Sequence, residues 1–396
     1  MIPTVFTIPW LNIPIRGYGL MLMIGFLAAT WWAARRAARV KCDPDLIINM
    51  GFVALIAAVV GARVFYVLHY WERNFADRGL LAVFDITEGG MEFYGGFIGA
   101  FIAVVTFLWF KGVSLRLYLD IMVPSVMLGM GIARIGCFLN GCCWGAPCMT
   151  ELPWAVRFPY ASPATYRQWE ERQVTLPAEL IYVMADGRGT LLHRDWLALN
   201  LKRLAKTENA YDEAVSTLQQ AKKGNVDSQT LGRLTQKVTK AQKRRDKERQ
   251  DKETQLVTFH ERMFKTTHEH LWDLAQDARY ASIAVHPSQL YASAGGATLA
   301  ILLNAYFYRR KRHGMVLGVF LLLYPFMRVI EEVIRIDNPR DTAGLTISQF
   351  VSLVLFTSGC IYIYIIHRLP RRSPKAVPFV PPWDEPTPPK KQKKKQ

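Results

Sequence analysis

The sequence has few charged residues for its length, and it has no Cys-x-x-Cys motif. Only 20% of its 396 residues are charged, whereas 51% are hydrophobic. The missing motif argues against a zinc site of the paired-cysteine type. Four cysteines lie within twelve positions: Cys137, Cys142, Cys143 and Cys148. We expect them to pack as small buried thiols. The alternative is a disulfide in an oxidising compartment.

The start of the chain also has no basic segment and no small-residue cleavage site before its first apolar block. We expect that block to be a permanent helix and not a cleaved signal peptide. Apolar residues gather into blocks of about 20, the number that crosses a ~30 Å hydrocarbon core as a helix. The sequence therefore predicts an all-α, multi-pass membrane protein with seven transmembrane helices, at Gly17–Ala34, Leu46–His69, Phe93–Phe110, Leu119–Leu139, Gln289–Tyr308, Met315–Ile334 and Ile347–His367.

Basic clusters follow every second predicted span. Because lysine and arginine near span ends mark the cytoplasmic side, the N-terminus is expected outside and the C-terminus in the cytoplasm. The clusters comprise Arg35, Arg36, Arg39 and Lys41, then Lys111 and Arg116, then Arg309 to Arg312, and finally Arg368, Arg371 and Arg372. On the opposite side Arg73 and Arg78 are fewer and are mixed with Glu72 and Asp77.

A long polar region separates the fourth and fifth spans and is expected outside the membrane. Between Asp195 and Asp277 it has no proline and is rich in good helix formers. Apolar residues recur every three or four positions on both sides of Gly224-Asn225, which predicts a helical hairpin. Its charged face is either simply solvated or binds a partner such as an envelope protein.

Four domains follow from this pattern. Residues 1–143 hold the first four spans, 144–285 form an extracytoplasmic head with the helical insertion, 286–369 hold the last three spans, and 370–396 form a disordered basic cytoplasmic tail. The net charge of +17 is explained by anchoring residues and this tail. Polybasic segments beside a membrane usually meet anionic lipid, so no nucleic-acid partner is expected.

Three polar clusters lie at the ends of apolar spans. Two contain arginine, and the third is Glu92 to Gly96 at the start of the third span. Arg134 lies near the end of the fourth span, and Arg328 and Glu332 share one face of the sixth. An arginine inside a membrane indicates a functional site, and its guanidinium can donate two parallel hydrogen bonds to a phosphate. These residues predict a site for an anionic lipid headgroup. The alternative is an Arg–Glu pair that only fixes helix packing.

Glycines surround the outer start of the third span, at Gly89, Gly90, Gly95, Gly96 and Gly99. Small residues let helices or a headgroup approach the backbone closely. The hydroxyls of Tyr94 and Tyr18 could donate to a phosphate or ester oxygen, or the rings could be interfacial anchors. His286 cannot be assumed to reach Ser288 two residues later, so a serine hydrolase is disfavoured.

With these motifs in order, the chain resembles the prolipoprotein diacylglyceryl transferase family, bacterial enzymes that lipidate lipoprotein precursors. Six segments carry the resemblance across the predicted spans, but not across the insertion or tail. They are Ile15 to Met21, Gly90 to Gly99, Gly131 to Gly145, His286 to Tyr291, Arg328 to Arg335, and Ser348-Gln349.

The resemblance implies a multi-pass enzyme of the bacterial cytoplasmic (inner) membrane that transfers the diacylglyceryl group of phosphatidylglycerol to the cysteine thiol of a prolipoprotein lipobox. It implies no metal and no soluble cofactor. It places Arg134, Arg328 and Glu332 at essential positions of the family, and we add Tyr94 as a fourth catalytic candidate. Substrate-binding roles fall on Tyr18, Gly95, Gly96, Asn140, Gln289, Tyr291 and Arg335.

The chain departs from the family pattern at the motif histidine, which is Tyr94 here, and at Cys137 and Cys142. Tyrosine, with an ordinary pKa near 10, is a poor base at neutral pH. The proton acceptor for the substrate thiol stays open among Tyr94, Glu332 and the phosphate itself. Two other classes remain, a lipid or solute transporter, which the absence of an internal repeat disfavours, and an inactive scaffold that binds envelope proteins.

Overall fold

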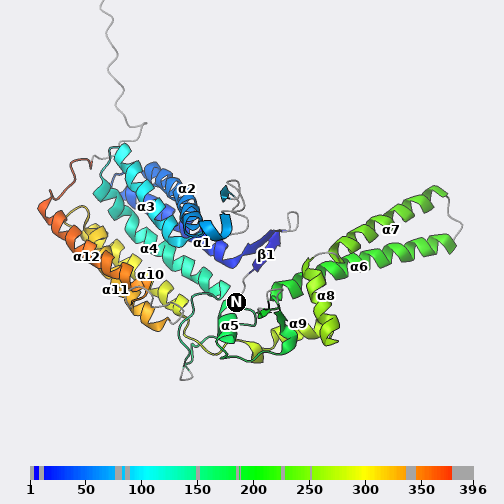
Figure 1. Ribbon diagram of the computed structural model, residues 1–396. Coiled ribbons are helices and arrows are strands. Elements are labelled where there is room, and N and C mark those ends of the chain that lie inside the picture. Colours follow the sequence, from blue (N-terminus) through cyan, green and yellow to red (C-terminus); the bar gives the residue numbers. More distant parts are fainter. Residues whose placement is uncertain are drawn as a thin grey trace, which may run out of the picture. The chain divides into compact units, whose positions relative to one another are not determined.

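The computed structural model describes residues 4–8, 13–75, 83–84, 90–148, 152–183, 187, 189–223, 228–249, 252–335 and 345–376. The chain forms two compact units, whose elements are labelled in Figure 1. The membrane unit comprises Ile2–Leu139 and Ser288–Gln396, and the insertion unit comprises Asn140–Pro287.

All seven segments predicted to span the membrane are helical in the membrane unit. They are α1 (Gly17–Arg39), α2 (Pro44–His69), α3 (Phe93–Phe110), α4 (Leu115–Asn140), α10 (Ser288–Arg309), α11 (Met315–Ile334) and α12 (Ile347–Arg368). Among the described residues, five of these helices, α1, α2, α4, α10 and α12, are long and apolar enough to cross a bilayer. The chain is therefore a multi-pass helical membrane protein. Helix α3 is shorter in its described part, and α11 carries three charged residues.

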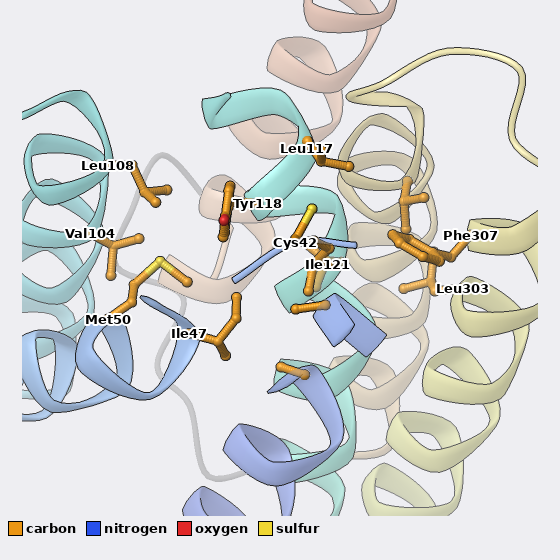
Figure 2. Packing of buried hydrophobic residues seen from close by; sticks show 14 of the residues in the cluster. Cys42, Ile47, Met50, Val104, Leu108, Leu117, Tyr118, Ile121, Leu303 and Phe307 are labelled. Carbon is orange, nitrogen blue, oxygen red and sulfur yellow. The ribbon is translucent and has the colours of Figure 1, made fainter. Parts of the chain in front are cut away.

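The packing of this unit is that of a protein surrounded by lipid. A buried cluster joins α2, α3, α4 and α10 (Figure 2), with Ile47, Leu108, Ile121 and Leu303 almost completely enclosed. Large apolar side chains also cover the outside, including Phe110, which is 78% exposed. Helices satisfy their own backbone groups, so such an outer surface is stable in hydrocarbon and unfavourable in water.

Small residues bring α2 and α3 into direct backbone contact. A Cβ added to Gly61 would lie 2.5 Å from the Gly95 carbonyl oxygen, and one added to Gly99 would lie 2.8 Å from the Ala57 carbonyl oxygen. A Cβ on Gly95 would collide with the Phe65 side chain. Gly95 therefore holds two helices together, as small residues do in membrane interfaces.

A buried carboxylate fixes the start of α11. Asp120 of α4 is fully buried and accepts hydrogen bonds from the backbone N–H groups of Gly314, at 2.7 Å, and Leu317, at 3.0 Å. Asp120 also pairs with Arg310, whose Nε lies 3.0 Å from Oδ2 of the carboxylate. The carboxylate thus satisfies donors that a helix start leaves unbonded and stabilises the positive end of the helix dipole.

Arg36 differs from the sequence-based expectation. Predicted as one of several cytoplasmic anchors, it lies inside α1 and is 1% exposed. Its guanidinium donates to Asn304 Oδ1 at 2.9 and 3.0 Å, to Ser125 Oγ at 2.9 Å and to the Ile121 carbonyl at 2.5 Å. Because Pro124 interrupts the backbone bonding of α4, Arg36 stabilises that helix at its proline and ties α1 to α4 and α10.

The insertion unit has its own core. It contains α5 (Pro163–Glu170), the antiparallel strands β3 (Ile181–Val183) and β4 (Gly189–Leu191), α6 (Arg194–Lys223), α7 (Ser228–Arg249), α8 (Lys252–Phe264) and α9 (His268–Gln276). Leu180, Leu192 and Leu271 are completely buried in it. The hydroxyl of buried Tyr160 lies 2.8 Å from the carbonyl oxygens of Leu180 and Leu192 and binds this core to the strands.

Helices α6 and α7 lie side by side as a long hairpin (Figure 1). The apolar residues predicted to form its seam, among them Ala214, Leu218, Leu234 and Val238, are buried or half-buried. The predicted turn at Gly224-Asn225 lies outside the described residues, as do Gly89 and the tail beyond Ala376.

Several short elements were not predicted. In the membrane unit an antiparallel hairpin, β1 (Thr4–Ile8) and β2 (Ile13–Arg16), leads into α1, and a π-helical turn at Trp71–Phe75 follows α2. The insertion unit contains 3-10 turns at Ala178–Leu180 and Ala278–Tyr280. The six cysteines, all in the described part of the chain, form no disulfide.

Candidate functional site

A narrow pocket between α4, α10 and α11 contains the first of the predicted arginines. Arg134 lines it together with Glu331 and Tyr324, and the remaining walls are apolar or small: Met127, Met130, Ala292, Gly296 and Met327. The pocket's volume of about 10 Å³ is roughly what one water molecule requires. Glycines let α4 and α10 pack closely at this pocket, because a Cβ added to Gly296 would lie 3.1 Å from the Cα of Gly131. Arg134 thus reaches a polar recess inside an apolar helix bundle.

Arg328 is held by three side chains at the edge of this pocket. Its Nη2 lies 2.7 Å from Glu332 Oε2 and donates to Ser348 Oγ of α12 at 2.8 Å, and its Nη1 lies 3.5 Å from Glu331 Oε2. Glu332 is almost completely buried, with 1% of its side chain exposed. The predicted pairing of Arg328 with Glu332 is therefore present, and Ser348 fixes the guanidinium from a second helix.

Two residues that the sequence analysis left out complete the cluster. Glu331 shares the pocket with Arg134, and its Oε1 is buried with no hydrogen-bond partner among the described residues. Tyr324 lies one helical turn before Arg328 and lines the same pocket as Arg134 and Glu331. The signal for both was available, because residues 324, 327, 328 and 331 share one face of α11.

Tyr94 stands at the start of α3, where its side chain is 39% exposed. The loop before it is held by α2: Arg63 donates to the Gly90 carbonyl at 3.0 Å, and His69 Nδ1 lies 2.8 Å from Glu92 Oε1.

The remaining predicted residues divide into two groups. Gln289 is buried in the first turn of α10, on the same face as Ala292 and Gly296 of the pocket. Gly95 and Gly96 are buried against α2, so their described contacts are with a helix. Tyr18, at the start of α1, is exposed, and Tyr291 and Arg335 are half-buried at helix ends. Asn140, the last residue of α4, belongs to the insertion unit.

The chemistry of this arrangement favours an anion. The guanidinium of Arg134 lines the recess, and that of Arg328 is paired with Glu331 of the recess wall and with Glu332. Guanidinium groups fit phosphate oxygens in a fixed fork geometry, and they repel metal cations. Tyr324 adds a hydroxyl donor to the lining of the recess.

Apolar helices with an arginine-lined recess define an integral membrane protein with an internal polar site. A family model described as prolipoprotein diacylglyceryl transferase matches residues 3–365, which is most of the chain. The chain therefore belongs to the prolipoprotein diacylglyceryl transferase family.

Individual relatives match over shorter stretches. Three carry the name phosphatidylglycerol–prolipoprotein diacylglyceryl transferase. One from Rhodopirellula baltica is 38% identical over 38% of this chain and 31% of its own length. One from Pseudoalteromonas translucida is 37% identical over 41% of this chain and 59% of its own. One from Shewanella oneidensis is 30% identical over 50% of this chain and 70% of its own. The chain thus spans less than two thirds of the first two relatives.

Proposed function

We propose that this protein transfers the diacylglyceryl group of phosphatidylglycerol to the thiol of a lipobox cysteine in a prolipoprotein signal peptide. The observation that carries the proposal is a recess between apolar helices that Arg134, Tyr324 and Glu331 line, with Arg328 paired to Glu331 at its edge. Family membership and the names of the relatives support it. The setting we propose is the bacterial inner membrane, with seven spans and the N-terminus outside.

The reaction needs no oxidant and no cofactor. The thiolate sulfur attacks the glyceryl carbon that carries the phosphate, a carbon–sulfur bond forms, and the carbon–oxygen bond to phosphate breaks. Glycerol phosphate leaves with the bonding electrons, and the thiol proton passes to a base. Arg134 and Arg328 stabilise the charge that grows on the departing phosphate, an effect that is large in a water-poor site.

Glu332 positions Arg328 by holding its Nη2 at 2.7 Å, while Ser348 holds it from α12. The proton acceptor is one of three groups, Tyr94, Glu332 or the leaving phosphate. Glu332 is occupied by Arg328 and Tyr94 is a weak base at neutral pH, so we favour the phosphate. We further propose that Gln289 and Tyr18 contact the lipid headgroup, with Asn140, Tyr291 and Arg335 as further substrate contacts and Gly95 and Gly96 as packing residues beneath Tyr94.

The test is a reconstituted reaction of the full chain with phosphatidylglycerol and a lipobox peptide, followed by mass spectrometry of the peptide. We expect a diacylglyceryl adduct from the native chain and at least about a hundredfold slower formation with Arg134→Ala. Arg134→Lys keeps the charge without the bidentate geometry and should fall between the two.

Lys111→Ala, which removes an exposed cation after α3, is the matched control and should keep full activity. No adduct from folded native protein would overturn the proposal. The competing function, an inactive scaffold that binds an envelope protein, has no specific observation in its favour.

A further inference from the structure

Helix α7 of the insertion unit carries a continuous row of exposed cations. Five of them recur at intervals of four, three, four and three residues: Arg233, Lys237, Lys240, Arg244 and Lys247. This spacing places all five on one face of the helix. Over 14 residues at 1.5 Å each, the row is about 21 Å long. We refer to these five residues as the cationic row.

The charges of the row are not neutralised within the described part of the chain. The acids of α7 are Asp246 and Glu248. Asp246 pairs with Arg245 at 3.0 Å, and the Arg245 guanidinium lies 4.0 Å from the centre of the Tyr211 ring of α6. Arg245 therefore faces the α6 seam, and the described ion pairs include no member of the row.

Such a row destabilises an isolated helix, because like charges three or four residues apart repel each other. An anionic partner would remove this repulsion. The row has no apolar member, and the half-buried Leu234, Val238 and Ala241 lie on a different face, beside α6. Protein interfaces usually have an apolar or aromatic centre, so a partner that offers only charge fits better.

We propose that the cationic row is a docking surface for the phosphate groups of an anionic phospholipid bilayer. A straight row on one face of a helix matches a flat array of phosphates, and each lysine or arginine held near such a surface strengthens binding about fivefold. This surface is separate from the proposed catalytic pocket and does not depend on the transfer reaction.

The test uses the full chain, with the five lysines after Pro389 changed to Gln in every protein compared so that the basic tail does not bind lipid. Each protein is placed in nanodiscs of neutral phosphatidylcholine and mixed with vesicles of phosphatidylcholine containing about one third phosphatidylserine. Phosphatidylserine supplies the anionic charge without being the proposed donor lipid. We expect the nanodiscs to float with these vesicles and not with vesicles of phosphatidylcholine alone. Binding should weaken as salt rises from about 0.1 M to about 1 M, since the Debye length falls from about 10 Å to about 3 Å.

Two variants with equal loss of charge separate the row from net charge. Changing Lys237, Lys240 and Lys247 to Gln removes three members of the row and should weaken vesicle binding about a hundredfold. Changing Lys206, Lys222 and Lys265 to Gln removes three exposed cations that lie outside α7 and should weaken it far less. All three proteins should have the same helix content by circular dichroism.

Equal binding by the two variants would overturn the proposal, as would equal binding to neutral vesicles. Binding of the protein to poly-glutamate but not to anionic vesicles would also overturn the proposal, and it would indicate an acidic protein partner.

Discussion

The membrane unit and the insertion unit both contain many arginines, but they use them in opposite ways. Arg36 and Arg328 in the membrane unit are buried and bonded to several partners. Arg233 and Arg244 in the insertion unit are exposed on a row of like charges. A charge in hydrocarbon is stable only when its partners are fixed, whereas a charge in water needs none. The same residue type therefore sets geometry in one unit and remains available for binding in the other.

Glu332→Ala should give the largest effect, because it leaves the buried guanidinium of Arg328 without its closest carboxylate. We expect a loss of about 3–5 kcal/mol of unfolding free energy, together with loss of transferase activity. The matched change Glu171→Ala breaks an exposed pair with Arg167 in the insertion unit and should cost at most about 1 kcal/mol. Thermal unfolding in detergent measures both, and equal effects would contradict the contrast between the units.

Asp120→Asn should destabilise the protein and leave the rate of the proposed transfer reaction unchanged. It removes the charge that faces Arg310 and weakens the bonds to the start of α11, so we expect a cost of about 3 kcal/mol. Asp120 and Arg134 are 14 residues apart on α4, about 21 Å along the helix. Activity per folded molecule should stay at the native level. A fall in that specific activity would show that the Asp120 carboxylate also acts on the recess.

Replacing a glycine by alanine should change the unfolding free energy in opposite directions in the two units. Gly95→Ala puts a methyl group against Phe65 and the Gly61 carbonyl and should cost about 1–3 kcal/mol. Gly232→Ala, in α7, has nothing within 4 Å of its new Cβ and should stabilise the helix by about 1 kcal/mol. Unfolding of both variants in the same detergent measures the difference. A stabilising Gly95→Ala would mean that α2 and α3 can separate at little cost.

The smallest effect concerns pH. Burial, and then the charges of Arg310, Arg116 and Arg372, lower the pKa of His313 to about 4. The neutral ring accepts a hydrogen bond from the Ser373 N–H at 3.3 Å. Since the unfolded chain binds this proton more readily, stability is fully present above pH ~6.5 and declines as the pH falls toward about 4.

We expect a loss on the order of 1 kcal/mol across this window, because solvent partly reaches the ring. Unfolding of the native chain and of His313→Asn should be compared at both ends of the window. The variant should lose less stability on acidification, and an identical pH dependence would exclude His313 as the cause.

The helices of the membrane unit could be predicted because apolar length is a strong local signal. Met315–Ile334 and Phe93–Phe110 have the predicted bounds, and the other helices extend the prediction by a few residues. The pairing of Arg328 with Glu332 was predictable from their four-residue spacing. The short strands β1 to β4 were missed, because strands of three to five residues leave little periodicity to detect.

Other features depended on contacts between distant parts of the chain. Arg36 follows an apolar block as an anchor would, and only the positions of Asn304 and Ser125 show that it is buried. Glu331 was passed over for its neighbour Glu332. Its spacing placed it on the helix face of Arg328, but only the tertiary structure shows that it lines a recess with Arg134.

The sequence by itself determined the class of protein, its apolar helices, the polar insertion and the arginines that mark the site. These follow from local physics, namely hydrophobic length, helix periodicity and the cost of charge in lipid. The tertiary structure decided which charges are partners and which glycines are interfaces. Those depend on distances between helices that are far apart in the sequence, and no local pattern specifies them. The row on α7 lies between the two cases: its spacing is in the sequence, but its exposure required the fold.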